Sequence, residues 1–326
     1  MRKLSVRHER FPIRGVFAIS RGSRTVQDVV VAEIAEGGVH ARGECVPYPR
    51  YGETIEGVVA DIAARADAIA AGLDRASLQE AMAPGAARNA LDCALWDLEA
   101  KRAMAPVWRL AGLPEPKPIV TAFTLSLASP EAMGLAAREN ADRPLLKIKL
   151  GGDGDLARLE AVRAEAPRAR LIVDANEAWV GESLSKFLPE MVRLGVSLVE
   201  QPLPAGSDEA LARVAHPVPV CADESCHTSE DIGKLVGRYD FVNVKLDKTG
   251  GLTEAIKLID AARAAKLGIM VGCMVGTSLS MAPATLLGSA ARFVDLDGPL
   301  LLAEDRPHGL RYEDGRVFPP AAALWG

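Results

Sequence analysis

The chain has 326 residues, of which 49% are hydrophobic and 25% are charged, so its composition is that of a globular protein with ample material for a large core. Its formal net charge of -5 argues against nucleic acid or an anionic membrane surface as the main partner. No apolar run reaches the roughly 18 residues of a membrane span, and the N-terminal residues lack the apolar stretch of a signal peptide.

The first third of the chain predicts a mixed α+β region. Residues 29–35 and 39–46 form two apolar runs on either side of an EGG turn, which is typical of a β-hairpin. Two alanine-rich stretches, about 54–71 and 86–104, predict helices. The stretch LPEPKP at 113–118 predicts a linker, because closely spaced prolines disfavour both helices and strand pairing.

Beyond this linker the chain predicts a repeated βα unit. Short apolar runs recur every 20 to 28 residues, with helical segments such as 154–166 and 251–266 between them. Eight such strands favour a (β/α)8-type barrel, with an open doubly wound sheet as the alternative. The turn-rich segment from about residue 301 is expected to pack back on the N-terminal region. The eight runs begin near Ile119, Leu145, Leu171, Leu198, Val218, Phe241, Ile269 and Phe293.

Charged residues stand at the C-terminal ends of most of these runs. In a barrel those ends meet at one face, where active sites lie, so the charges are expected to converge. Taken singly, each acid could cap a helix and each lysine could be a surface residue. Together they would leave an unscreened charge cluster unless something binds there. From strand two to strand eight they are Lys147, Lys149, Asp174, Glu200, Asp223, Lys245, Asp295 and Asp297.

The three acids of strands three to five predict a metal site. Carboxylates without a nearby His or Cys set suit a hard cation, which we expect to be Mg²⁺, with Mn²⁺ as the alternative. The five histidines have no HxxxH-like spacing, which disfavours zinc.

The lysines predict acid–base chemistry at this site. Strands two and six are opposite each other in a ring of eight, so Lys149 and Lys245 could face one substrate carbon from two sides. The metal would stabilise an enediolate formed by removing the proton next to a carboxylate, and two bases on opposite faces suit a 1,1-proton transfer. Lys147 shares the strand face of Lys149 and would be its electrostatic partner.

These motifs resemble the enolase superfamily, in its muconate-lactonizing subgroup. The resemblance rests on KIK in strand two, Asp/Glu/Asp in strands three to five and NVK in strand six, and it covers essentially the whole chain. It implies an α/β fold, a modified TIM barrel (β/α)7β with an N-terminal α+β capping domain. The implied division is a cap at 1–116, a catalytic barrel at 117–300 and a C-terminal segment at 301–326 that packs back on the cap.

Within the subgroup, VDLDGP resembles the dipeptide epimerases, in which the Asp-x-Asp pair holds the substrate's α-ammonium. The stretches RGSR, GECVPYPRYGE and ADESCHT resemble the L-Ala-D/L-Glu epimerases. This resemblance implies that Thr124, on the first barrel strand, and the backbone of Cys273 contact substrate. It also implies that Arg24, in a loop of the cap, clamps an acidic side chain. A solvated surface charge is the alternative for both arginines of this loop, and it suits Arg21 better than Arg24. The implied roles of the remaining residues are Lys149 and Lys245 as acid/bases, Asp174, Glu200 and Asp223 as metal ligands, and Asp295 and Asp297 as the ammonium site.

The implied function is a Mg²⁺-dependent epimerase that inverts the C-terminal residue of L-Ala-L-Glu or L-Ala-D-Glu in muropeptide metabolism. Three alternatives stay open: a dipeptide epimerase of other side-chain preference, a lyase such as o-succinylbenzoate synthase or a cycloisomerase, and a barrel that only binds metal or peptide. The expected partner is a small dipeptide, and a homo-oligomer stays open. Five cysteines without a CxxC motif disfavour a disulfide framework, so we expect a cytoplasmic protein.

Overall fold

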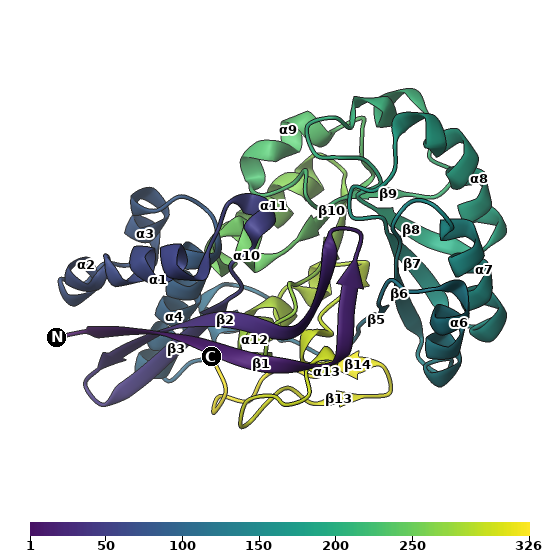
Figure 1. Cartoon of the computed structure of the whole chain (residues 1–326). Helices are drawn as coiled ribbons and strands as arrows, with labels where there is room; N and C mark the ends of the chain where they lie inside the picture. The colour runs from purple at the N-terminus through teal and green to yellow at the C-terminus, as the bar shows by residue number, and fades with distance from the viewer.

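The computed structural model describes residues 1–326, and its N-terminal part is built on a three-stranded antiparallel sheet in the order β1-β2-β3. The predicted hairpin is confirmed, since β2 (Gly22–Glu36) pairs with β3 (Val39–Cys45). Strand β1 (Lys3–Ile19) was not predicted; it pairs with β2 and makes a second, longer hairpin. Figure 1 shows this purple β1–β2 hairpin running from the cap to the barrel.

Helices cover one face of this sheet. The helix predicted over 54–71 is two helices, because the chain leaves the helical path between Ala64 and Arg65. The helix predicted over 86–104 is confirmed as α4. The helices of this part are η1 (Pro49–Tyr51), α1 (Ile55–Ala63), α2 (Ala66–Ala70), α3 (Arg75–Ala81), α4 (Ala86–Ala103) and α5 (Val107–Leu110).

Helix α4 lies directly on strand β3 because Gly43 has no side chain. A Cβ at this position would stand 2.1 Å from the backbone oxygen of Ala90 and 2.8 Å from the backbone nitrogen of Ala94. Real Cβ atoms do not approach backbone atoms this closely, so Gly43 permits the contact that joins helix and sheet in the cap.

The second part of the chain is an eight-stranded parallel sheet in the order β12-β11-β10-β9-β8-β7-β6-β5. Its two edges meet, since the Ala122 N–H donates to the Val294 carbonyl at 2.8 Å, and this closes the ring. The predicted barrel fold with an N-terminal cap is confirmed. The strands are β5 (Phe123–Leu125), β6 (Leu145–Lys149), β7 (Arg170–Asp174), β8 (Val196–Glu200), β9 (Val220–Ala222), β10 (Phe241–Val244), β11 (Gly268–Val271) and β12 (Phe293–Val294).

Helical segments connect the strands on the outside of the ring (Figure 1). Seven βα units precede the last strand, in agreement with a (β/α)7β barrel, although the connection after β8 is a 3₁₀ helix. The segments are α6 (Pro130–Glu139), α7 (Asp155–Glu165), η2 (Gly181–Ser183), α8 (Leu184–Arg193), η3 (Glu209–Arg213), η4 (Ser229–Asp231), α9 (Ile232–Leu235), α10 (Leu246–Thr249), α11 (Leu252–Ala264), α12 (Ser278–Thr285), η5 (Gly288–Ala290) and α13 (Gly298–Leu301).

The start of the first barrel strand was predicted wrongly. The run that begins near Ile119 forms β4 (Ile119–Val120), which pairs with the C-terminal strand β14 (Arg316–Val317) in a small sheet completed by β13 (Tyr312–Glu313). The barrel strand β5 begins only at Phe123. The C-terminal hairpin supplies the partner for residues 119–120, and its pairing is invisible in the local sequence.

An apolar layer fills the base of the barrel. It takes one inward-facing residue from each strand, and successive inward positions are two residues apart. Above Leu145 on β6, for example, the same face carries Lys147 and Lys149, while Leu146 and Ile148 belong to the outer core. The layer therefore places the charged strand ends inside the upper half of the ring. Its members are Ala122, Leu145, Ile172, Leu198, Cys221, Phe241, Met270 and Phe293.

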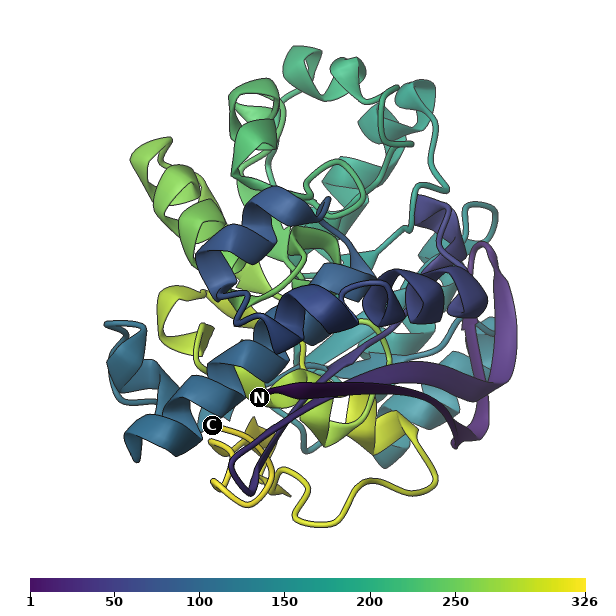
Figure 2. The ribbon, with the colours of Figure 1, turned by 90° about the vertical axis from the view of Figure 1, so that its left-hand side faces the viewer.

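The chain's last residues lie against the cap helix α4, as Figure 2 shows for the yellow C-terminal segment. The Trp325 Nε1–H donates to the Cys93 carbonyl at 3.0 Å, and the Gly326 N–H donates to Asp97 at 2.8 Å.

The division of the chain into cap, barrel and C-terminal segment at residues 116 and 300 stays a prediction. Residue 300 falls inside α13. None of the helices combines the length and apolar character needed to cross a membrane.

We expect Gly43→Ala to lower the free energy of unfolding by about 1–3 kcal/mol, because the added methyl group forces α4 away from β3. Chemical denaturation followed by circular dichroism measures the change. Gly233→Ala in α9 is the matched control, since no atom lies within 4 Å of a Cβ at that position. Equal stability of the Gly43 variant and wild type would contradict the packing argument.

Candidate active site

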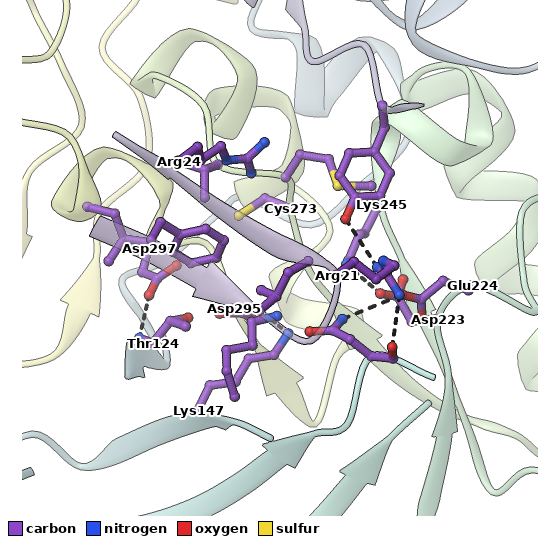
Figure 3. A pocket seen from close by; sticks show the side chains of 18 of the residues that line it. Arg21, Arg24, Thr124, Lys147, Asp223, Glu224, Lys245, Cys273, Asp295 and Asp297 are labelled. Carbon is purple, nitrogen blue, oxygen red and sulfur yellow. Dashed lines mark hydrogen bonds and ion pairs between the residues drawn. The ribbon is translucent and has the colours of Figure 1, made fainter. Parts of the chain in front are cut away.

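Most of the charged strand ends line a cavity in the mouth of the barrel (Figure 3). Asp174 and Glu200 are fully buried and are not part of this lining. The cap covers this cavity with side chains from the tip of the β1–β2 hairpin and from the segment around η1. Barrel and cap therefore contribute to one site. The cap residues that line it are Phe17, Ile19, Arg21, Arg24, Tyr48 and Tyr51.

Three carboxylates form an acidic triad at the ends of β7, β8 and β9. Asp174, Glu200 and Asp223 are buried, and one oxygen from each lies within 4.8 Å of the others. The Oε2 atom of Glu200 is buried, and the Lys147 ammonium lies 2.7 Å from it. An all-oxygen set of buried carboxylates can hold a hard divalent cation such as Mg²⁺, as predicted.

Two lysines bind opposite ends of this triad. The Lys149 Nζ donates to Asp174 at 2.6 Å, and the Lys245 Nζ donates to Asp223 at 2.6 Å. Both side chains line the cavity. The structure thus brings together the two lysines that were predicted from strands two and six, with the middle acid, Glu200, between their partners.

Burial and mutual attraction shape the charges here. Although burial opposes a charged ammonium, the carboxylates hold the pKa of Lys147 and of Lys245 well above the ordinary lysine value. Burial and the neighbouring Asp174 raise the pKa of Glu200 to about 7, whereas the lysines outweigh burial at Asp223 and keep the pKa of that carboxyl well below its usual range. Sharing these carboxylates with a divalent cation would lower the pKa of the lysines, as a general base requires.

Lys147 connects the triad with the acidic pair of the eighth strand. Its ammonium lies 2.7 Å from Glu200, 2.7 Å from Asp295 and 3.2 Å from Asp174. It therefore neutralises acids on three strands, and Lys149 is not among its contacts. Its predicted role in binding substrate stays a prediction.

The Asp295/Asp297 pair lies on the other side of the cavity, beside the first strand (Figure 3). The Thr124 N–H donates to Asp297 at 2.6 Å, and the Oδ1 atom of Asp295 accepts no hydrogen bond. Burial and the charge of Asp295 raise the pKa of Asp297 to about 7. Two buried acids with spare acceptor capacity favour a cationic group such as an ammonium.

Arg24 is a partly buried cation without an ion-pair partner. It lines the cavity, and its guanidinium lies 5.4 Å from the centre of the Phe17 ring. Burial lowers its pKa, so an anionic ligand would stabilise its charge. Cys273 also lines the cavity, and burial raises the pKa of its thiol well above the ordinary value, which disfavours a thiolate.

Arg21 is not a freely solvated charge. Its side chain is 26% exposed, and its guanidinium pairs with Glu224 at 2.7 Å and with Glu177 at 3.0 Å. Both partners lie on barrel loops, at least 155 positions away in the sequence, so no local pattern in SRGSRTV could have indicated them.

Sequence reasoning missed Lys248. Its ammonium is buried and donates to the Asp223 carboxylate at 2.6 Å, to the Asp223 carbonyl and to the Asn243 carbonyl at 2.9 Å. It thereby fixes one oxygen of a triad residue and joins the ends of β9 and β10. Its position three residues after Lys245, on a short helix that begins at the strand end, is the signal that could have found it.

Two further residues of the site were also missed. Asn243 donates to Glu200 at 2.7 Å, and it stands two residues before Lys245 on the inward face of β10. Tyr51 lines the cavity, and its buried hydroxyl has no hydrogen-bond partner. The two-residue period could have indicated Asn243, whereas nothing local marks Tyr51.

Known proteins with these features are similar to this chain along its whole length. Residues 1–112 match the N-terminal domain of the mandelate racemase/muconate lactonizing enzyme family, and residues 132–323 match the enolase C-terminal domain-like family. The chain belongs to this enolase superfamily. The resemblance predicted from the strand-end motifs is thus confirmed.

Relatives within the superfamily are named epimerases and racemases. The L-Ala-D/L-Glu epimerase of Escherichia coli K12 is 45% identical over 97% of this chain and 99% of its own. An N-acetyl-D-glutamate racemase from Pseudoalteromonas is also 45% identical, over 91% of this chain and 95% of its own.

Solved structures agree with this grouping. An enolase family member from Agrobacterium tumefaciens, described as homologous to dipeptide epimerases, is 56% identical and superimposes with a TM-score of 0.98 over 100% of both chains; it contains sodium and L-Ala-L-Glu. Crystal structures of more distant dipeptide epimerases contain Mg and a dipeptide.

We expect Glu200→Gln to weaken Mg²⁺ binding at least about tenfold in isothermal titration calorimetry, since losing even an outer-shell partner of a metal ligand typically costs about 10–100-fold in affinity. Asp260→Asn, an exposed change on α11, is the matched control and should bind as wild type does. Equal affinity of Glu200→Gln and wild type would show that the cation binds elsewhere.

Proposed function

We propose that this protein is a Mg²⁺-dependent epimerase that inverts the α-carbon of the C-terminal residue in L-Ala-L-Glu or L-Ala-D-Glu. The observation that carries the proposal is the placement of Lys149 and Lys245 at opposite ends of one acidic triad. Both lysines share a cavity with a second acidic pair and with an unpaired arginine. The names of the Escherichia coli and Agrobacterium tumefaciens relatives support the choice of dipeptide.

The two lysines move the proton. One lysine, as a neutral amine, takes the α-proton onto its Nζ, and the other, as an ammonium, gives a proton to the opposite face of the same carbon. Mg²⁺ held by Asp174, Glu200 and Asp223 would supply positive charge beside the substrate carboxylate, which makes the α-proton more acidic. The direction of inversion then depends on which lysine is neutral when substrate binds.

Two charged features select the substrate. The Asp295/Asp297 pair would hold the ammonium of the N-terminal alanine, because Asp295 has a free oxygen in the cavity. Arg24 would hold the side-chain carboxylate of the C-terminal glutamate, since it has no acidic partner of its own and a bidentate pair would stabilise both charges. An apolar side chain would leave this partly buried arginine without an anionic partner, which disfavours the rival dipeptide preferences.

The competing substrates lack one of these groups. N-acetylglutamate has no ammonium that Asp295 and Asp297 could hold, and neither have the substrates of an o-succinylbenzoate synthase or a cycloisomerase. We therefore expect the dipeptide to be the better substrate, although a relative of equal identity is named an N-acetyl-D-glutamate racemase.

The cytoplasmic location, a homo-oligomeric state and a role in muropeptide metabolism remain predictions. The five unpaired cysteines support the cytoplasmic location.

The test is incubation with L-Ala-L-Glu and Mg²⁺ in D₂O, with the glutamate α-proton followed by NMR. We expect metal-dependent loss of that proton and appearance of the L,D diastereomer. Lys149→Ala and Lys245→Ala should each lower the rate of epimerisation by about 10²–10⁴-fold, and each should still exchange the α-proton of one diastereomer. Those two half-reactions would assign each lysine to one face of the carbon.

Three controls accompany this experiment. EDTA should abolish exchange, and the exposed Lys117→Ala variant should react as wild type does. N-acetyl-L-glutamate serves as the substrate without an ammonium. Faster exchange of N-acetylglutamate than of the dipeptide would reassign the substrate, and epimerisation at the wild-type rate by either lysine variant would refute the two-base mechanism.

We expect Arg24→Met to raise the KM for L-Ala-L-Glu by about 10–100-fold, because a charge-assisted hydrogen bond contributes about 1.5–3 kcal/mol. Steady-state kinetics with L-Ala-L-Met as a second substrate provides the internal comparison, since its side chain has no carboxylate. A similar loss with both dipeptides would mean that Arg24 does not recognise the side chain.

A further inference from the structure

The tip of the β1–β2 hairpin is fastened to the barrel, and Arg21 makes most of the polar contacts. The Arg21 Nη1 donates to the Asn176 carbonyl at 2.9 Å and to Glu177 at 3.0 Å. Its Nη2 donates to Glu224 at 2.7 Å and to the Tyr48 hydroxyl at 3.1 Å. One guanidinium thus joins the hairpin to two barrel loops and to a second segment of the cap (Figure 3).

The barrel side of this contact has an unusual backbone. Asn176 and Glu177 both have a positive φ, 43° and 69°, although neither is a glycine. Such conformations are costly and persist where the surroundings impose them. Here the turn presents the Asn176 carbonyl to two donors of the hairpin tip, the Arg21 guanidinium and the Ser20 hydroxyl at 3.0 Å.

The partners of Arg21 lie next to the acidic triad. Asn176 follows the triad residue Asp174 by two positions, and its own N–H donates to that carboxylate at 2.9 Å. Glu224 directly follows Asp223, another triad residue, and its side chain is 1% exposed. The hairpin tip is therefore tied to residues that adjoin two of the three triad members.

The hairpin carries the proposed specificity residue close to this contact. Arg24 stands three residues after Arg21, on the strand opposite Phe17, and it makes no ion pair that could hold it in place. Besides Arg21 and Ser20, the tip is held by the Ala18 carbonyl, which accepts from the Leu127 N–H at 3.0 Å. The position of Arg24 over the cavity therefore depends on how the tip is docked.

We propose that Arg21 is a positioning residue, which locks the hairpin tip onto the loops that follow two triad residues and thereby holds Arg24 over the cavity. The lock itself is a property of the protein without substrate. The effect on glutamate recognition rests on the proposed function. Arg21 touches no reacting atom in this assignment and acts through Arg24.

The first test needs no substrate. In Arg21→Met, amide hydrogen exchange across residues 17–24 should be at least tenfold faster than in wild type. The reason is that the tip loses the four hydrogen bonds that the Arg21 guanidinium makes with the barrel loops and with Tyr48. Arg10→Met, an exposed change on strand β1 of the same hairpin, is the matched control and should exchange as wild type does. Unchanged exchange in Arg21→Met would overturn the lock, whether or not the protein is an epimerase.

The second test asks whether the lock acts through Arg24. We expect Arg21→Met to raise the KM for L-Ala-L-Glu at least tenfold with less than threefold change in kcat, and Arg21→Lys to recover part of the loss. The double variant Arg21→Met/Arg24→Met should be no worse than Arg24→Met alone, since a lost lock cannot misplace a residue that is absent. Additive losses would overturn the positioning role, and a circular dichroism melt shows that each variant is folded.

Discussion

The structure depends on the burial of opposite charges inside the mouth of a barrel. Five carboxylates, those of the triad and of the Asp295/Asp297 pair, and four lysines are removed from water there, and each would be costly if it were left without a partner. The apolar layer beneath them forces this arrangement, because the next inward-facing positions on each strand lie two residues above it. The charged mouth and the apolar base both follow from the alternation of inward-facing and outward-facing side chains along each strand.

Much of this arrangement was predictable from the sequence, because it is local. A charge that ends an apolar run, repeated from strand to strand, indicates both the register and the face, and the triad and its two lysines follow from that pattern. The positions that sequence reasoning missed depend on distant partners. Arg21 meets Glu224 across 203 residues, and residues 119–120 leave the barrel because a C-terminal strand pairs with them. Lys248 lies between these two cases. It is close to Lys245 in the sequence, but it reaches the site only because a one-turn helix after the strand directs its ammonium toward Asp223.

The cap and the barrel contribute different things to this site. The barrel supplies the acidic triad, the lysines and the Asp295/Asp297 pair, all on strand ends whose positions are fixed by the ring. The cap supplies Arg24 and the aromatic residues around it, on a hairpin and a short 3₁₀ segment. The proposed acid–base residues thus lie on strand ends of the ring, and the residue proposed to recognise the side chain lies on the hairpin of the cap.

The long β1–β2 hairpin has an evolutionary consequence. Its tip is a contiguous stretch of about eight residues that contributes no base and no member of the triad, so mutations there can alter which substrate is accepted while the proton-transfer machinery stays intact. Substitutions in this short segment could therefore change the substrate specificity during evolution. Each new tip would have to keep a cation able to reach the Asn176 carbonyl and Glu224. Directed evolution on this scaffold would begin with libraries confined to that tip.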